Sequence, residues 1–306
     1  MTAAPPRPER RTRLANGIEL AWDSFGNADA PPLLLVMGLG AQMVDWDDAF
    51  CAQLAQAGDH RVIRFDNRDA GHSTWLPQLG IPDIQGLMMQ AMAGRHVLAP
   101  YTLRDMADDC AGLMDALKIE RAHVVGASMG GAIGQELAMH HPKRMRSFTS
   151  IMSTTGNPAL PPPTPEAMAV LFAPAPTSFD AYRLHHAKVW RVLRGPDFPL
   201  DEARDDERAQ LTFLRGLNPA GVGRQLAAIF ASGNRKPALR DARVPTLVIH
   251  GDADPLVPVA CGVDVADAIP GAQLLRIARM GHALPIPMWP QIVGAIAAHT
   301  AVHRDH

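Results

Sequence analysis

The sequence predicts an α/β protein with a mostly parallel sheet that is covered by helices on both faces. Two observations predict this class. Short apolar stretches typical of buried strands alternate along the chain with longer stretches of helical period. The 306 residues, of which 47% are apolar, can also bury one large core, and the formal charge is only −2.

The predicted elements follow one another in a regular order. Stretches typical of strands lie at residues 18–25, 32–37, 61–65, 124–127, 146–152, 244–251 and 273–277. A helix over residues 103–117 precedes the fourth of these strands, and another begins near residue 290. Because parallel strands need long crossover connections, this alternation favours a parallel sheet.

The alternation of strands and helices breaks after residue 155. Seven prolines lie between Pro158 and Pro176, and proline disrupts the interior of a helix or strand. The stretch that follows, to about residue 234, predicts three helices and no strand. We therefore expect a helical cap inserted into the sheet domain, with the first part of that domain at residues 1–155, the cap at 156–236 and the second part at 237–306.

A sharp turn is expected at Ser128. The strand before it runs into Gly126-Ala127-Ser128-Met129-Gly130, which matches the G-x-S-x-G pattern of a nucleophile elbow. The two glycines leave room for a strained turn that lifts the serine hydroxyl above the strand ends. Ser128 is therefore the candidate nucleophile, although a serine at such a turn can also be an ordinary helix cap.

A serine acts as a nucleophile at neutral pH only with a base and a carboxylate beside it. Asp252 and Asp254 follow the strand that ends at residue 251, and His282 follows the strand at residues 273–277. The candidates thus lie just past strand ends in the order Ser, Asp, His. Spacing alone does not choose between the two aspartates. The other twelve histidines are expected to be structural or exposed.

These motifs resemble those of the α/β-hydrolase superfamily. The resemblance also includes residues 34–40, Trp46 after them, and the segments at 65–73, 251–258 and 281–285, so that it covers nearly the whole chain. The chain looks most like the esterase branch that includes aclacinomycin methylesterase and the haloperoxidase-like and enol-lactonase-like serine hydrolases. In that branch the acid is the last residue of G-x-x-D, which implies Asp254 here.

An oxyanion hole is also expected. The Gly38-Leu39-Gly40 turn follows an apolar strand and can present a backbone N–H toward Ser128. The resemblance implies Leu39 as one donor and Met129, the residue after the nucleophile, as the other. The helix predicted to begin at Met129 adds partial positive charge at its N-terminus.

The substrate pocket is expected between the strand-end loops and the cap. Met is flexible and adapts to varied apolar ligands, so the methionine-rich segment at residues 87–92 is of interest, although it can equally be a helix that packs into the cap. No cluster of Arg or Lys is evident near the candidate triad. The pocket candidates are Trp46, Met88, Met92, Trp190 and Phe213.

The predicted function is that of a serine esterase for uncharged, largely apolar carboxylic esters. The same triad also supports a lactonase, a perhydrolase or a carbon–carbon bond hydrolase. Dehalogenases and soluble epoxide hydrolases of this superfamily carry an aspartate in place of Ser128, which disfavours them. A non-catalytic ligand receptor of the same fold remains as an alternative.

Other classes are disfavoured by composition. The near-neutral charge gives no basic excess for nucleic acid, and no phosphate-binding glycine-rich loop, secretory signal or membrane-spanning run is found. Three well-separated cysteines suggest free thiols of a cytoplasmic protein, and no Cys/His spacing suggests a metal. We expect a small-molecule ester as the partner and no cofactor, while a homo-oligomer is left open.

Overall fold

A computed structural model describes residues 8–174, 176–198 and 201–304 of the chain. Eight strands form one sheet in the order β1-β2-β4-β3-β5-β6-β7-β8. β2 is antiparallel to β1 and β4, and every other neighbouring pair is parallel, which confirms the predicted class. The strands are β1 (Arg10–Arg13), β2 (Glu19–Phe25), β3 (Pro32–Val36), β4 (Arg61–Phe65), β5 (Ala122–Ala127), β6 (Met145–Ile151), β7 (Thr246–Gly251) and β8 (Gln273–Ile277).

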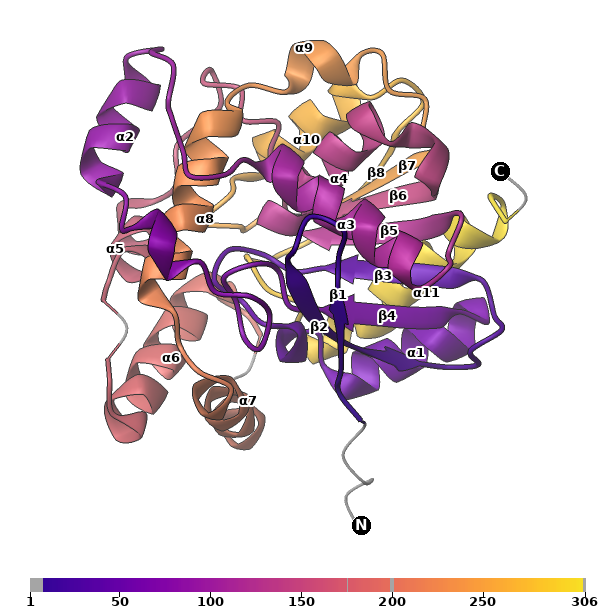
Figure 1. The fold of residues 1–306 in the computed structure, drawn as a ribbon, viewed down its shortest axis with the longest axis horizontal. Coiled ribbons are helices and arrows are strands. Elements are labelled where there is room, and N and C mark those ends of the chain that lie inside the picture. The colour runs from indigo at the N-terminus through magenta and orange to yellow at the C-terminus, as the bar shows by residue number, and fades with distance from the viewer. Residues whose placement is uncertain (1–7, 175, 199–200, 305–306) are drawn as a thin grey trace.

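Helices cover both faces of the sheet (Figure 1). Alternate residues of β3 show why: Leu34 and Val36 join the core cluster with α3 (Leu103–Ala116) and α4 (Met129–His140), whereas Leu33 and Leu35 join the cluster with α1 (Asp48–Gly58) and α11 (Trp289–Ala301). Successive strand side chains point to opposite faces, so a strand covered on both sides is apolar throughout.

After Pro176 and up to residue 234, the described residues contain three helices, as predicted, and a fourth helix lies within the proline-rich stretch before them. The four helices are α5 (Pro165–Leu171), α6 (Phe179–Leu193), α7 (Glu202–Leu214) and α8 (Pro219–Ser232). The additional helix begins at Pro165, inside the proline-rich stretch. Proline is well tolerated at the first position of a helix, where its missing N–H has no helical partner. In Figure 1 these helices gather to the left of the sheet.

The two ends of this helical stretch are joined to each other. The Arg235 backbone N–H donates to Thr155 O at 2.8 Å, and the Arg235 guanidinium donates to Thr154 O at 2.8 Å. A Cβ on Gly156 would lie 2.1 Å from Gly233 O, so the chain leaves and re-enters the sheet domain at one point.

The remaining α-helices of the described residues are α2 (Ile84–Met92), α9 (Lys236–Leu239) and α10 (Val259–Ala268). These residues also form four short 3₁₀ helices, η1 (Met43–Asp45), η2 (Pro77–Leu79), η3 (Pro142–Arg144) and η4 (Ile286–Met288). The three cysteines are buried and form no disulfide. Within the described residues, no helix combines the length and apolar character needed to cross a membrane. The same residues contain no group of three or more His, Cys, Asp or Glu side chains that could hold a metal ion.

Candidate active site

The turn at Ser128 has the strained geometry that its sequence predicts. Ser128 lies between β5 and α4 with φ 56° and ψ −121°, a conformation that non-glycine residues rarely adopt. A Cβ on Gly126 would lie 2.2 Å from Gly130 O, and a Cβ on Gly130 would lie 2.0 Å from Val36 O. Gly126 is therefore required for β5 and α4 to approach each other this closely, and Gly130 for α4 to approach the end of β3.

The structure brings Ser128, His282 and Asp254 together. His282 Nε2 lies 3.0 Å from Ser128 Oγ, and His282 Nδ1 lies 2.8 Å from Asp254 Oδ2. The three residues follow β5, β8 and β7, whose carboxyl ends meet at one edge of the parallel sheet. His282 and Asp254 are each only 6% exposed, so solvent has little access to the hydrogen bond between them.

Asp254 is held by more than the histidine. Its Oδ1 accepts hydrogen bonds from the backbone N–H groups of Leu256 at 2.9 Å and Val257 at 2.7 Å. A second buried histidine, His250, lies with its Nε2 2.7 Å from Val257 O and 3.6 Å from Asp254 Oδ2. Burial lowers the pKa of His250, which keeps this ring neutral. The loop therefore fixes Asp254 in the orientation that faces His282.

Asp252, the alternative acid, makes a different contact. Its Oδ1 accepts a hydrogen bond from the Arg279 backbone N–H at 2.5 Å, and its side chain is exposed. No hydrogen bond to His282 is found for it among the described residues.

The Gly38-Leu39-Gly40 turn lies directly beside the serine. A Cβ on Gly38 would be 3.1 Å from Ser128 Cβ. Met129, on the other side, is the first residue of α4, where backbone N–H groups have no helical acceptor. Gly38, which precedes Leu39, and Met129 thus lie on either side of Ser128.

A cavity of about 260 Å³ lies next to these residues, and its lining includes Ala127 before the serine and Ala283 after the histidine. Trp46 and Trp190, two of the expected pocket residues, line it together with Phe50 and Trp289.

Met88, Met92 and Phe213, which we also expected at the pocket, do not line this cavity. The two methionines lie on α2, which packs against α8 at the upper left of Figure 1, and Met92 is 81% exposed. The Phe213 ring packs instead against Phe179 and Tyr182.

One wall of the cavity is charged, contrary to the expectation that no cluster of Arg lies near the triad. Arg194, Arg204 and Arg208 line it, with Asp45, Asp47, Asp201 and Asp205. Arg204 and Arg208 pair with Asp47, and Arg194 pairs with Asp205. Burial raises the pKa of Asp45. Each arginine thus contacts an aspartate, with Arg204 and Arg208 sharing Asp47, and the pairs with Asp47 join positions too far apart in sequence for spacing to reveal them.

Comparison with known proteins agrees with this geometry. A family model described as "alpha/beta hydrolase fold" matches residues 31–287. The chain belongs to the α/β-hydrolase family.

Two curated relatives within the α/β hydrolases are similar along nearly their whole length. Rhodomycin D methylesterase DauP from Streptomyces sp. (strain C5) is 31% identical over 92% of this chain and 95% of its own. Rhodomycin D methylesterase DnrP from Streptomyces peucetius is 29% identical over 94% of this chain and 98% of its own. These relatives support an ester hydrolase.

A solved structure has the same fold. The enol-lactonase from Burkholderia xenovorans LB400 superposes with a TM-score of 0.70 at 24% sequence identity, covering 95% of this chain and all of that one. The expected α/β-hydrolase family and the resemblance to methylesterases are therefore confirmed, and the enol-lactonase shares the fold.

Proposed function

We propose that this protein is a serine hydrolase that cleaves uncharged carboxylic esters through an acyl-enzyme on Ser128. The observation that carries the proposal is the chain of hydrogen bonds from Ser128 Oγ through His282 to Asp254. An isolated serine hydroxyl is a poor nucleophile, and this arrangement supplies both a base and a group that orients the base.

The proposed reaction has two halves. His282 accepts the proton of Ser128 as the hydroxyl attacks the ester carbonyl, and Asp254 stabilises the imidazolium that forms. His282 then gives the proton to the leaving alcohol. A water molecule, activated by the same histidine, hydrolyses the acyl-enzyme. The N–H groups of Leu39 and Met129 would stabilise the negative oxygen in both halves, and one such donor is typically worth about 10²- to 10³-fold in rate.

Residues 156–236 are proposed to act as a cap. The cavity beside Ser128 is lined by residues of both parts of the chain, including Trp46 and Trp289 from the sheet domain and Trp190 and Arg204 from the helical stretch. The joined ends of this stretch, at Thr155 and Arg235, support the same division of the chain into 1–155, 156–236 and 237–306.

The cavity supports an uncharged substrate. Its aromatic side accepts an apolar group, and on its charged side every arginine is paired with an aspartate. Binding a carboxylate there would require an existing ion pair to be broken. Because the two relatives are named as methylesterases, methyl esters are the first substrates that we propose for this chain.

Labelling with a fluorophosphonate tests the serine directly. We expect one adduct, located on Ser128 by mass spectrometry, and none in Ser128→Ala. That variant should fold normally and lose about three to six orders of magnitude in turnover. Labelling of another residue, or full activity of the alanine variant, would contradict the proposal.

A substrate panel tests the reaction class separately. It compares methyl esters of bulky acids, short-chain acyl esters, a lactone, a 1,3-diketone and an emulsified long-chain triglyceride. We expect the soluble esters to be cleaved fastest. Cleavage of only the lactone or the diketone would be consistent with Ser128 as the nucleophile but would contradict the assignment as an esterase. A preference for the emulsified triglyceride would contradict a pocket that is covered by the cap.

A further inference from the structure

The turn beside Ser128 is tied to the helical stretch by one buried side chain. Gln225, on α8, accepts a hydrogen bond from the Gly40 backbone N–H at 2.8 Å through its Oε1. Its Nε2 donates to Arg68 O at 2.8 Å, and the side chain is fully buried. Both halves of the amide are therefore occupied, which fixes its orientation.

The hydrogen bond reaches the peptide that defines the turn. The Ala41 backbone N–H donates to Gly38 O at 3.3 Å, and Gly40 has φ +66°, a combination that fits a type II turn with Gly40 at its third position. The central peptide of that turn joins Leu39 to Gly40. Its N–H, which belongs to Gly40, donates the hydrogen bond to Gln225 Oε1. Glycine tolerates either orientation of this peptide, so the turn alone does not fix it.

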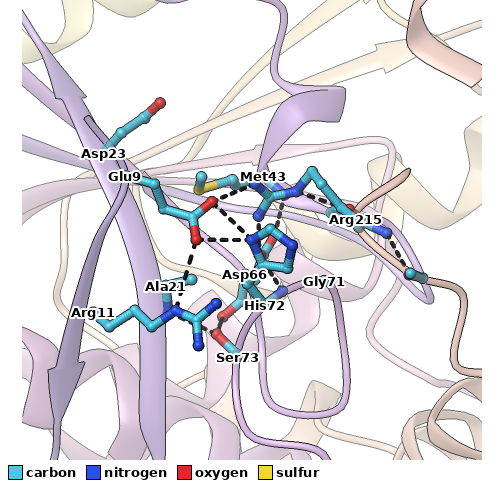
Figure 2. A network of polar contacts seen from close by, with 12 residues as sticks. Glu9, Arg11, Ala21, Asp23, Met43, Asp66, Gly71, His72, Ser73 and Arg215 are labelled. Carbon is cyan, nitrogen blue, oxygen red and sulfur yellow. Dashed lines mark hydrogen bonds and ion pairs between the residues drawn. The ribbon is translucent and has the colours of Figure 1, made fainter. Parts of the chain in front are cut away.

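A second set of contacts holds the residues just after the turn. Gln42 Nε2 donates to Gly216 O at 2.9 Å, and Gln42 Oε1 accepts from Arg215 Nε at 2.9 Å. Arg215 also pairs with Glu9 and Asp66, and Figure 2 shows these carboxylates around its guanidinium. Gln42 and Arg215 thus hold the residues after the turn, and Gln225 holds the central peptide of the turn itself.

We propose that Gln225 is a positioning residue for the oxyanion hole. By holding the Gly40 N–H, it ties the turn to α8 and so keeps the preceding Leu39 N–H in a fixed position relative to Ser128. The inference rests on the proposed function, since it assumes that Ser128 is acylated. It assigns to the helical stretch a role in catalysis in addition to lining the cavity.

The test uses three variants of the full-length protein. Gln225→Met keeps the length of the side chain and removes both polar groups. Gln225→Glu keeps an oxygen that can accept from Gly40. Gln135→Met is the matched control, because Gln135 is equally buried and also makes two hydrogen bonds, to Arg235 and Thr154, but does not contact the turn.

The measurements are kcat and KM per active site titrated with a fluorophosphonate, the rate constant of that phosphonylation, the pH–rate profile and the Tm. Misplacing a group in an active site lowers the reaction rate by up to about 100-fold. We therefore expect Gln225→Met to lower kcat and the phosphonylation rate by about ten- to 100-fold, with KM within about threefold and an unshifted pH profile. Gln225→Glu should retain most of the rate. Gln135→Met should lower the Tm without lowering kcat.

The inference is overturned if Gln225→Met keeps the rate of the unmodified enzyme per titrated site, if Gln225→Glu loses as much as Gln225→Met, or if Gln135→Met loses as much. If Gln225→Met does not fold, Gln225→Asn replaces it, because its amide is one methylene too short to reach Gly40. A protein that is not labelled on Ser128 refutes the proposed function itself, whereas labelling at Ser128 with no effect at Gln225 refutes only the positioning role.

Discussion

The candidate triad and the charged wall of the neighbouring cavity are built in different ways. Ser128, Asp254 and His282 stand on three loops that follow strands of one parallel sheet. The topology of the sheet brings such loops to one edge, so residues marked by separate motifs must meet. The wall is built from α6, α7 and the residues before α1, whose contact depends on how helices pack. Strand-end residues can thus be assigned from motifs, whereas ion pairs between separate helices cannot.

The largest expected effect concerns the acid of the triad. Asp254→Asn should lower kcat by about two to four orders of magnitude, because an amide cannot stabilise the imidazolium and favours the wrong tautomer of His282. Asp252→Asn is the control and should change kcat less than about threefold, since Asp252 contacts the Arg279 backbone instead. Steady-state kinetics with one methyl ester would decide, and the reverse ranking would refute the strand-end assignment.

The stability of the fold is expected to fall at acidic pH because of a histidine at the other end of the strands, away from the candidate triad. His123, near the start of β5, is fully buried against His60, and its Nδ1 lies 2.8 Å from Ser147 Oγ. Burial lowers the pKa of His123 from 6.5 to about 3, and the nearby His60 and Arg146 act in the same direction. Between these two values the unfolded chain binds a proton that the folded chain does not, so stability is full above about pH 6.5 and falls as the pH drops toward 3.

Urea unfolding at pH 7.5 and pH 5 measures this loss. For His123 alone it should be on the order of 1 to 2 kcal/mol at pH 5. His123→Gln should reduce the difference between the two pH values by that amount and leave the labelling of Ser128 unchanged. An equal pH dependence in both proteins would show that His123 does not carry the effect.

The sequence predicts most strands of the sheet, but it does not predict the first strand or the ion pairs of the cavity wall. The predicted strands at residues 61–65 and 273–277 match β4 and β8, because short stretches rich in apolar residues are typical of strands. β1 was missed, since Arg10–Arg13 has no apolar face and is a strand only through its pairing with β2. The charged wall was missed as well: Arg204 meets Asp47 across 157 positions, and no local pattern marks that pair.

The role of the cap in substrate choice can be tested with two aromatic residues that the sequence analysis places at the pocket. Trp190 lines the cavity, whereas Phe213, on α7, packs against two aromatic rings of α6 and does not line it. Trp190→Ala should raise kcat/KM for longer acyl groups relative to short ones by about three- to tenfold, because one methylene in an apolar pocket is worth at least that much. Phe213→Ala should lower the Tm and leave the ratio unchanged. An equal shift in both variants would mean that cap stability, rather than contact with the substrate, sets the preference.

The smallest expected effect tests the balance of charge in the wall. Although burial alone would raise it, hydrogen bonds from Arg204 hold the pKa of Asp47 below its usual range. Asp47→Asn retains an acceptor for the Ala49 N–H that caps α1, but it leaves Arg204 and Arg208 without their counter-ion.

The cavity of that variant would then carry an excess of positive charge. We expect kcat/KM for the monomethyl ester of a dicarboxylic acid to rise about two- to fivefold relative to the dimethyl ester, the size of a typical partly exposed ion pair. Added salt should reduce the gain, because the new attraction is electrostatic. Asp206→Asn is the control, since Asp206 pairs with Arg183 on the exposed side of the same helices. If the ratio stays constant in Asp47→Asn, the arginines do not face the substrate, and the preference for uncharged esters must have another cause.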